Sequence, residues 1–299
     1  MMVRMFGESE EGLPFRWDLV TPDRLGSLLA DNDEPDLWFL EELVACAGKV
    51  LARSANGDLI FVGRSLDSMF DLLGGALADL EREARLRRLP LSFVRDGVGT
   101  FRTFRRRALT PGELAKARRM LAAVDVTPRA LASRNRPVAF VDVVSRGATF
   151  TELFDLLREW IDDERQPWPV IRSKLRFIGV TSRTKTSPNT YRWQQHAAWT
   201  RTLPARAVVN VSLDPRVWSY FGDSQIKLTR SFRPEDWLAA ADGPARGERT
   251  RHALAEAVAL VAHGRSQAGR RALAHAMRRE PALAQPWLRA LVTALNGGG

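Results

Sequence analysis

Cysteine is almost absent from this chain, since Cys46 is the only one among 299 residues. A single cysteine excludes an intrachain disulfide and a cysteine-rich zinc site. Long apolar runs are also missing, because stretches such as Val138 to Val141 are far shorter than the roughly 20 residues of a membrane-spanning helix. The acidic N-terminus shows no basic-then-apolar signal pattern. These absences predict a cytoplasmic protein that does not associate with a membrane.

Several nucleotide and metal signatures are missing as well. The chain has no Gly-x-Gly-x-x-Gly sequence and no Walker-type Gly-Lys-Ser/Thr loop. Its four histidines stand singly, at positions 196, 252, 263 and 275. No spacing of His, Cys and carboxylates suits a metal ion, so we expect no metal site built from protein ligands alone.

Charge is distributed unevenly along the chain. Residues 1–42 carry three arginines against eleven acids, a net charge of −8. Residues 82–134 carry fourteen basic residues against four acids, a net charge of +10. Such a stretch attracts nucleic acid, an acidic partner or a phosphate-rich substrate. A solvated, arginine-rich helical surface explains the same composition.

Short apolar strands alternate with amphipathic helices over most of the sequence. We expect strands at 59–62, 90–94, 137–141, 175–181 and 207–211, and helices at 37–51, 66–80, 110–124 and 149–163. Strands that are apolar on both faces and alternate with helices are typical of a parallel sheet covered on both sides. The sequence therefore predicts an α/β fold with a mainly parallel sheet and helices on both faces.

Composition divides the chain into three parts. Residues 1–36 are acidic and rich in proline, which predicts a loosely ordered extension. Residues 37–241 form the predicted α/β domain. Residues 242–299 are rich in Ala and Arg, which predicts an α-helical appendage with a disordered Gly tail. This appendage either packs on the α/β domain or presents a surface to a protein partner.

The stretch from Asp142 to Thr149 has the composition of a phosphate-binding loop. A buried strand leads into Asp142, and Ser145, Gly147 and Thr149 precede a helix. Backbone N–H groups at a helix N-terminus are unpaired, and the helix dipole favours an anion there. Gly147 permits close approach of the backbone, and the two hydroxyls add hydrogen bonds.

This stretch resembles the phosphoribosyl-pyrophosphate loop of type I phosphoribosyltransferases. The family pattern is an apolar strand, two acids, two apolar residues, two small polar residues, Gly, any residue and Thr. The matching positions here are the strand, Asp142, Val143, Val144, Ser145, Gly147 and Thr149. The resemblance implies that Asp142 holds the ribose hydroxyls and that Ser145, Arg146, Gly147, Ala148 and Thr149 hold the 5-phosphate. The chain departs from the pattern at Val141, where the first acid stands, and at Arg146, where a small polar residue is usual.

An earlier loop extends the resemblance. In the family a strand that precedes the phosphate loop ends in a loop whose backbone and basic residue bind pyrophosphate. Gly63, Arg64 and Ser65 follow the strand at 59–62 in the expected order, and an Arg can grip phosphate with two hydrogen bonds. Ser65 or Asp67 acting as a helix N-cap explains the same residues.

Two further parts of the family correspond to less specific segments. The family closes a flexible segment over its site, and here the arginine-rich residues 95–109 occupy that interval. A surface for nucleic acid explains the same arginines, because Phe101 and Phe104 are interleaved with them. The family builds its acceptor pocket after the strand that follows the phosphate loop, where Tyr191 and Trp193 are available to stack on a planar base, as is Trp218.

The resemblance implies an enzyme in which a nitrogen nucleophile displaces pyrophosphate from phosphoribosyl pyrophosphate, or the reverse reaction. Asp142 and Arg64 would be its catalytic residues, and Mg²⁺ would be bound mainly through the substrate. Two alternatives remain open at this point. One is a non-catalytic regulator of the same fold that senses a phosphorylated ribose or a nucleotide. The other is a nucleic-acid-binding protein.

Overall fold

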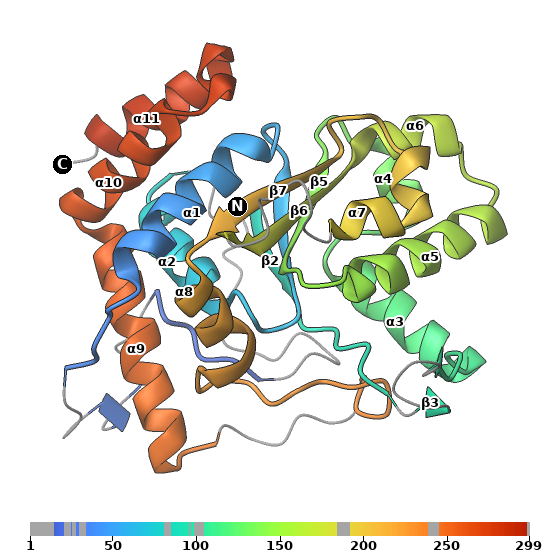
Figure 1. Cartoon of the computed structure of the whole chain (residues 1–299), viewed down its shortest axis with the longest axis horizontal. Helices are drawn as coiled ribbons and strands as arrows, with labels where there is room; N and C mark the ends of the chain where they lie inside the picture. Colours follow the sequence, from blue (N-terminus) through green and yellow to red (C-terminus); the bar gives the residue numbers. More distant parts are fainter. Residues whose placement is uncertain are drawn as a thin grey trace, which may run out of the picture.

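Five strands form one parallel sheet in the computed structural model (Figure 1). The structure describes residues 15–20, 25, 28–29, 34–80, 85–95, 97–98, 105–183, 192–238 and 245–297. The strand order is β2-β1-β5-β6-β7, and each neighbouring pair is parallel. The strands are β1 (Asp58–Val62), β2 (Leu86–Leu89), β5 (Val138–Val143), β6 (Leu175–Ser182) and β7 (Val208–Leu213). The prediction of an α/β fold with a parallel sheet is confirmed.

Helices precede and follow almost every strand. They are α1 (Leu40–Arg53), α2 (Asp67–Leu77), α3 (Pro111–Ala123), α4 (Pro128–Ser133), α5 (Ala148–Asp163), α6 (Trp168–Lys174), α7 (Trp193–His196), the 3₁₀ turn η4 (Ala198–Thr202), α8 (Pro215–Ser219) and the π turn η5 (Tyr220–Ser224). The C-terminal part contains α9 (Glu248–Arg265), α10 (Gln267–Arg278), the 3₁₀ turn η6 (Pro281–Ala284) and α11 (Pro286–Gly297). The start of α3 shows why the helix forms there. The Thr110 hydroxyl accepts from the Glu113 N–H at 3.2 Å while the Glu113 carboxylate accepts from the Thr110 N–H at 2.8 Å, which is a capping box.

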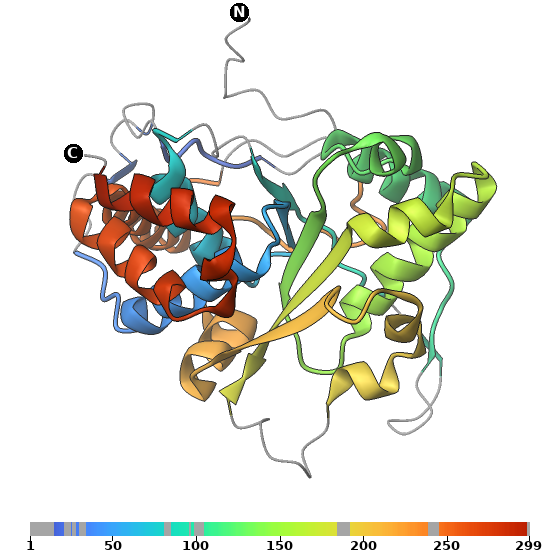
Figure 2. The same ribbon diagram turned by 90° about the horizontal axis from the view of Figure 1, so that it is seen from above.

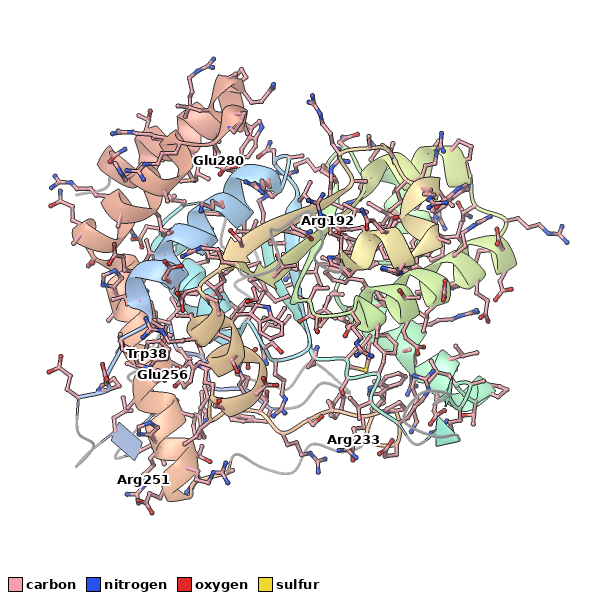
Figure 3. The ribbon with its side chains drawn as sticks, viewed as in Figure 1. Trp38, Arg192, Arg233, Arg251, Glu256 and Glu280 are labelled. Carbon is pink, nitrogen blue, oxygen red and sulfur yellow. The ribbon has the colours of Figure 1, made fainter. Side chains whose placement is uncertain are left out.

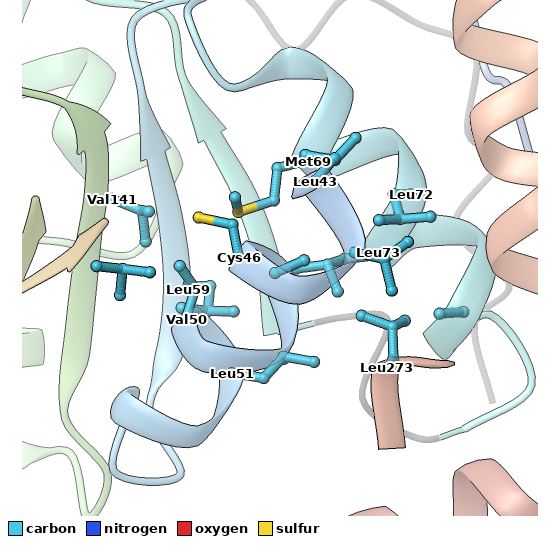
Figure 4. Packing of buried hydrophobic residues seen from close by; sticks show 14 of the residues in the cluster. Leu43, Cys46, Val50, Leu51, Leu59, Met69, Leu72, Leu73, Val141 and Leu273 are labelled. Carbon is cyan, nitrogen blue, oxygen red and sulfur yellow. The ribbon is translucent and has the colours of Figure 1, made fainter. Parts of the chain in front are cut away.

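The sheet separates two apolar cores because strand residues alternate between its faces. Leu59 and Phe61 of β1 belong to the core beneath α1, α2 and the C-terminal helices. Ile60 and Val62 belong to the core beneath α3 to α7. Helices therefore cover both faces of the sheet, as Figure 2 shows from above. Cys46 of α1 lies in the first core beside Leu59 and Val141 (Figure 4).

The C-terminal helices pack on the outside of α1 and α2. Helix α9 lies along α2, helix α10 along α1, and α11 along α10. The contact between α2 and α9 is a contact between backbones, because a Cβ at Gly75 would lie 2.0 Å from the Val261 carbonyl oxygen. A Cβ at Gly264 would lie 2.1 Å from the Leu72 carbonyl oxygen. The two glycines let these helices approach closely.

Several predicted strand boundaries differ from the structure; β7, for example, ends at Leu213 and not at 211. Residues 90–94 do not form a strand, and β2 lies earlier, at Leu86–Leu89. Leu91 and Phe93 are buried as an apolar run suggests, but the Ser92 N–H donates to the Phe232 carbonyl at 2.9 Å instead of to a sheet strand. Strand β5 continues two residues beyond its predicted end, to Val143.

The arginine-rich interval is held at its two ends by ion pairs. A short antiparallel hairpin of β3 (Gly97–Val98) and β4 (Arg105–Arg106) lies within it. The Arg95 guanidinium contacts the Glu152 carboxylate of α5 at 2.9 Å, and that of Arg107 contacts Glu113 of α3 at 2.6 Å. Arg102, Phe101 and Phe104, which the lid and nucleic-acid interpretations used, fall outside the described residues.

No helix among the described residues combines the length and the apolar character needed to cross a membrane.

Candidate functional site at the carboxyl edge of β1 and β5

The two predicted phosphate loops leave the same edge of the sheet from neighbouring strands. β1 pairs with β5 in parallel, so the loop after Val62 and the loop after Val143 lie side by side. The chain runs from β1 to β2 on one side and then crosses to β5 on the other, so the strand order reverses between β1 and β5. In open α/β sheets, ligands bind in the crevice at the carboxyl ends of the strands where this reversal occurs.

The loop after β5 exposes three of its predicted ligand-binding residues. Ser145, Arg146 and Ala148 are exposed, whereas Thr149 is half-buried. Helix α5 begins at Ala148 with Gly147 as its N-cap residue. The N–H groups of the first turn have no partner within a helix, so this loop and helix start present the donors that a phosphate group needs.

Gly147 has a role in packing that the sequence pattern did not reveal. Its φ of +78° lies in the left-handed region, which disfavours residues with a side chain. A Cβ at this position would lie 2.4 Å from Cε3 of the buried Trp193. The indole therefore lies directly behind the loop, and the need for glycine follows from Trp193 as well as from backbone conformation.

Asp142 is buried behind the loop. Its side chain is 6% exposed, and its Oδ1 accepts from the Val143 N–H at 2.7 Å. Burial raises the pKa of this carboxyl to about 8, although hydrogen bonds from Val143 and Thr149 and the positive charge of Lys227 act in the opposite direction. Burial therefore favours the neutral form of this carboxyl, which donates as well as accepts hydrogen bonds.

Val141, which stands where the family has its first acid, points to the opposite face of the sheet. It is fully buried in the core shared with Cys46 and Leu59 (Figure 4). A carboxylate at this position would be surrounded by apolar side chains and unpaired, which is costly.

The loop after β1 lies beneath a segment from the C-terminal half of the domain. We call residues 225–238 the capping segment; Figure 1 shows it in orange, below the sheet. The Arg64 guanidinium donates to the Thr229 carbonyl, and the Lys227 ammonium donates to the Ser65 carbonyl at 3.2 Å. Gly63, with a φ of +71°, donates its N–H to the Leu89 carbonyl at 2.9 Å. The capping segment thus holds the loop of Gly63, Arg64 and Ser65 against the sheet.

Lys227 is a candidate functional residue that sequence reasoning missed. Burial is the main cause that lowers the pKa of its ammonium group to about 8. Its electrostatic neighbours include Arg64 of the loop after β1 and Asp67 at the start of α2, and it acts on Asp142 at the end of β5. Lys227 therefore places positive charge near both loops, beside Ser65 and within reach of Asp142. It stands 85 positions after Asp142 in a segment without a motif, so only the fold reveals it.

A buried group of four charges supports the start of α2. Asp67 accepts from Arg88 of β2 at 3.1 and 3.2 Å and contacts Arg16 at 3.0 Å. Arg16 also pairs with Asp71, and Phe70 lies beneath both guanidinium groups. These positive charges hold the pKa of Asp67 below its usual value despite burial. Asp67 is thus fixed by ion pairs rather than aimed at a ligand.

The carboxyl groups near the two loops are engaged by neighbouring protein groups. Asp67 and Asp71 are bound by arginines, and Asp142 accepts a hydrogen bond from the Val143 N–H. Magnesium prefers several oxygen ligands in octahedral geometry. Among the described residues, no group of three or more His, Cys, Asp or Glu side chains is arranged to hold a metal ion.

The aromatic residues expected to form an acceptor pocket have structural partners. The Trp193 indole N–H donates to Asn210 Oδ1 at 3.0 Å, and its ring packs on Gly147. The Trp218 indole N–H donates to the Val180 carbonyl at 3.0 Å on the other face of the sheet. Tyr191 lies outside the described residues.

The chain is thus an α/β protein in which two polar loops lie side by side at the reversal point of a parallel sheet. No known family model, no curated protein and no solved structure matches this chain.

Proposed function

We propose that this protein binds phosphoribosyl pyrophosphate, or another ligand with a ribose 5-phosphate group, at the carboxyl edge of β1 and β5, as phosphoribosyltransferases do. The observation that carries the proposal is the parallel pairing of β1 with β5. It brings together two loops that begin 82 positions apart, at Gly63 and Ser145, and that the resemblance assigns to one ligand.

In this proposal the loop after β5 receives the 5-phosphate. The first-turn N–H groups of α5, the Ser145 hydroxyl and the exposed Arg146 guanidinium are its donors. Asp142 lies behind this loop, where its carboxyl group accepts a hydrogen bond from Thr149. In this proposal the same carboxyl group binds the ribose hydroxyls.

Arg64 and Lys227 supply positive charge on the opposite side of the crevice. Displacement of pyrophosphate develops negative charge on the leaving group and positive charge on the ribose ring. Preorganised cations near the leaving group would stabilise that transition state. Magnesium in this proposal is bound by the phosphate oxygens of the ligand.

The test is calorimetric titration of the full chain with phosphoribosyl pyrophosphate and Mg²⁺. Arg146→Ala should weaken binding at least tenfold, because an exposed guanidinium is lost from the loop without loss of packing. The matched control is Arg129→Ala, which removes an exposed arginine from α4, the helix before β5, at the opposite edge of the sheet. Absence of binding by the wild type at millimolar ligand, or equal affinities of the two variants, contradicts the proposal.

A non-catalytic regulator that binds the same ligand is the second candidate, and Val141 favours it. The position of the first acid is buried in an apolar core, so the crevice lacks one of the two acids of the family pattern. Release of pyrophosphate, measured by an enzyme-coupled assay with a panel of nitrogen nucleophiles, distinguishes the two. Binding without release for every acceptor supports the regulator.

A further inference from the structure

A groove lined by residues with polar side chains lies at the outer edge of β7, the last strand of the sheet. Its volume is about 520 Å³, which lies in the range of small-molecule sites. The walls contain three basic side chains, two hydroxyls and three amides: Lys49, Arg53, Arg192, Thr181, Ser212, Gln194, Gln195 and Asn210. None of these residues is acidic or apolar, so the groove carries positive charge and many hydrogen-bond donors.

The basic residues come from both sides of the sheet. Lys49 and Arg53 belong to the end of α1 on one face, and Arg192 directly precedes α7 on the other. Figure 3 shows Arg192 beside β7. Arg53 is held in place by Glu280, with Nε 2.9 Å from Oε2 and the terminal nitrogen 3.3 Å from Oε1. Glu280 balances the charge of Arg53, so Lys49 and Arg192 supply the excess positive charge.

The backbone of β7 adds two donors to the groove. The Phe177 N–H donates to the Ala207 carbonyl at 2.7 Å. In a parallel sheet, alternate residues of a strand point their N–H and C=O groups to opposite neighbours. The groups of residues 207, 209 and 211 therefore point toward β6, and those of 208, 210 and 212 point away from the sheet. The Arg53 guanidinium donates to the Asn210 carbonyl, which shows that this carbonyl points away from β6. The N–H groups of Asn210 and Ser212 therefore face the groove.

The contact of Arg53 with the Asn210 carbonyl favours an anion over an added peptide strand as the ligand of the groove. An extended peptide that adds to β7 as a sixth strand needs the Asn210 carbonyl as an acceptor, and Arg53 already occupies that carbonyl. An anion needs only donors, which remain in place. Phosphate groups are bound by arginine, lysine and backbone N–H groups together, and amide and hydroxyl side chains complement the hydroxyl groups of a sugar.

We propose that the β7 groove is a binding site for a small phosphorylated molecule with a polar, hydroxyl-bearing remainder. The site is separate from the crevice at β1 and β5. Trp193 lies between the two, because its ring packs on Gly147 of the phosphate loop and its N–H donates to Asn210 of the groove. The groove does not depend on the function proposed above, since none of its lining residues belongs to either phosphate loop.

The test is calorimetric titration of the full chain with inorganic tripolyphosphate, with a hexaglutamate peptide as the alternative anion. The double variant Lys49→Ala/Arg192→Ala should weaken tripolyphosphate binding at least tenfold, since charged hydrogen bonds are lost from the groove. Arg206→Ala is the control, because it removes an exposed arginine just before β7 that does not line the groove. Circular dichroism checks that each variant is folded.

Arg146→Ala separates this site from the phosphate loop. Tripolyphosphate binding that persists in Arg146→Ala and disappears in the double variant supports the groove. Binding that depends on Arg146 alone overturns the groove and leaves the phosphate loop as the anion site. The groove is also overturned by no binding of tripolyphosphate at millimolar concentration, or by stronger binding of hexaglutamate.

Discussion

Two features of position 147 require glycine: the backbone is in the left-handed region, and the Trp193 indole lies against the Cα. Gly147→Ala should lower the free energy of unfolding by about 2 to 4 kcal/mol, because the Cβ is disfavoured at this φ and overlaps the Trp193 ring. Gly112→Ala is the control, since no atom lies within 4 Å of a Cβ there. Urea unfolding of both variants measures the difference. Equal stabilities would show that the loop and Trp193 are not packed together.

Asp142 should make stability depend on pH. Its pKa is raised from 3.8 to about 8, so the folded state binds a proton that the unfolded state releases above about pH 4. The contribution of this proton to the free energy of unfolding is fully present below about pH 4 and is lost as the pH rises to about 8. Asp142→Asn cannot titrate. As the pH is raised, the variant should therefore become more stable relative to wild type, by at most about 1.4 kcal/mol per pH unit. Urea unfolding at pH 5, 6 and 7 tests this, and parallel curves would show an ordinary carboxylate.

The sequence predicted the local structure around the loop after β5 better than the residues that pack against it. Ser145, Arg146 and Thr149 follow a local rule, a strand, a small polar loop and a helix start, and they do lie at such a junction. Lys227 and Thr229 contact the loop after β1, and Trp193 packs behind Gly147, only because the fold brings these distant positions together. Contacts between such distant positions have no local pattern, and they need the fold.

At the scale of elements, apolar strands were the most predictable because their signal is burial on both faces. Strand β5 and helix α5 lie within two residues of their predicted bounds. The run at 90–94 was misread because burial alone does not distinguish a sheet strand from an extended segment. Leu91 and Phe93 are buried, but the backbone between them pairs with the capping segment.

The contact of α2 with α9 depends on the absence of a side chain at position 75. Gly75→Ala should destabilise the protein by about 1 to 3 kcal/mol, because the Cβ overlaps the Val261 carbonyl of α9. The adjacent Gly74→Ala is the matched control, since nothing lies within 4 Å of that Cβ and alanine favours a helix by up to about 1 kcal/mol. Thermal unfolding of the pair should give opposite shifts. A stable Gly75→Ala variant would contradict the close packing of these helices.

At the scale of the whole molecule, the C-terminal helices cover apolar surface that belongs to the α/β part. Leu273, Met277 and Leu288 lie in the same core as Leu43 of α1 and Leu72 of α2. The full chain should therefore unfold in one calorimetric transition, and a chain ending at residue 241 should bind the dye ANS strongly because this surface is exposed. Two separate transitions, or a folded shortened chain without dye binding, would show that residues 242–299 are an independent unit.

The rate at which a thiol reagent labels the lone cysteine reports how often the layer around Cys46 opens. Cys46 is 1% exposed between α1 and the sheet, and burial raises the pKa of its thiol to about 12. Only a thiolate attacks a disulfide reagent, so the folded chain should resist DTNB until α1 separates from the sheet. Because the chain has one cysteine, the labelling rate reports a single place, and its ratio to the rate in denaturant gives the free energy of that opening. A ligand bound at the loops after β1 and β5 should lower the labelling rate of Cys46 only if these loops open together with the layer of α1 and α2.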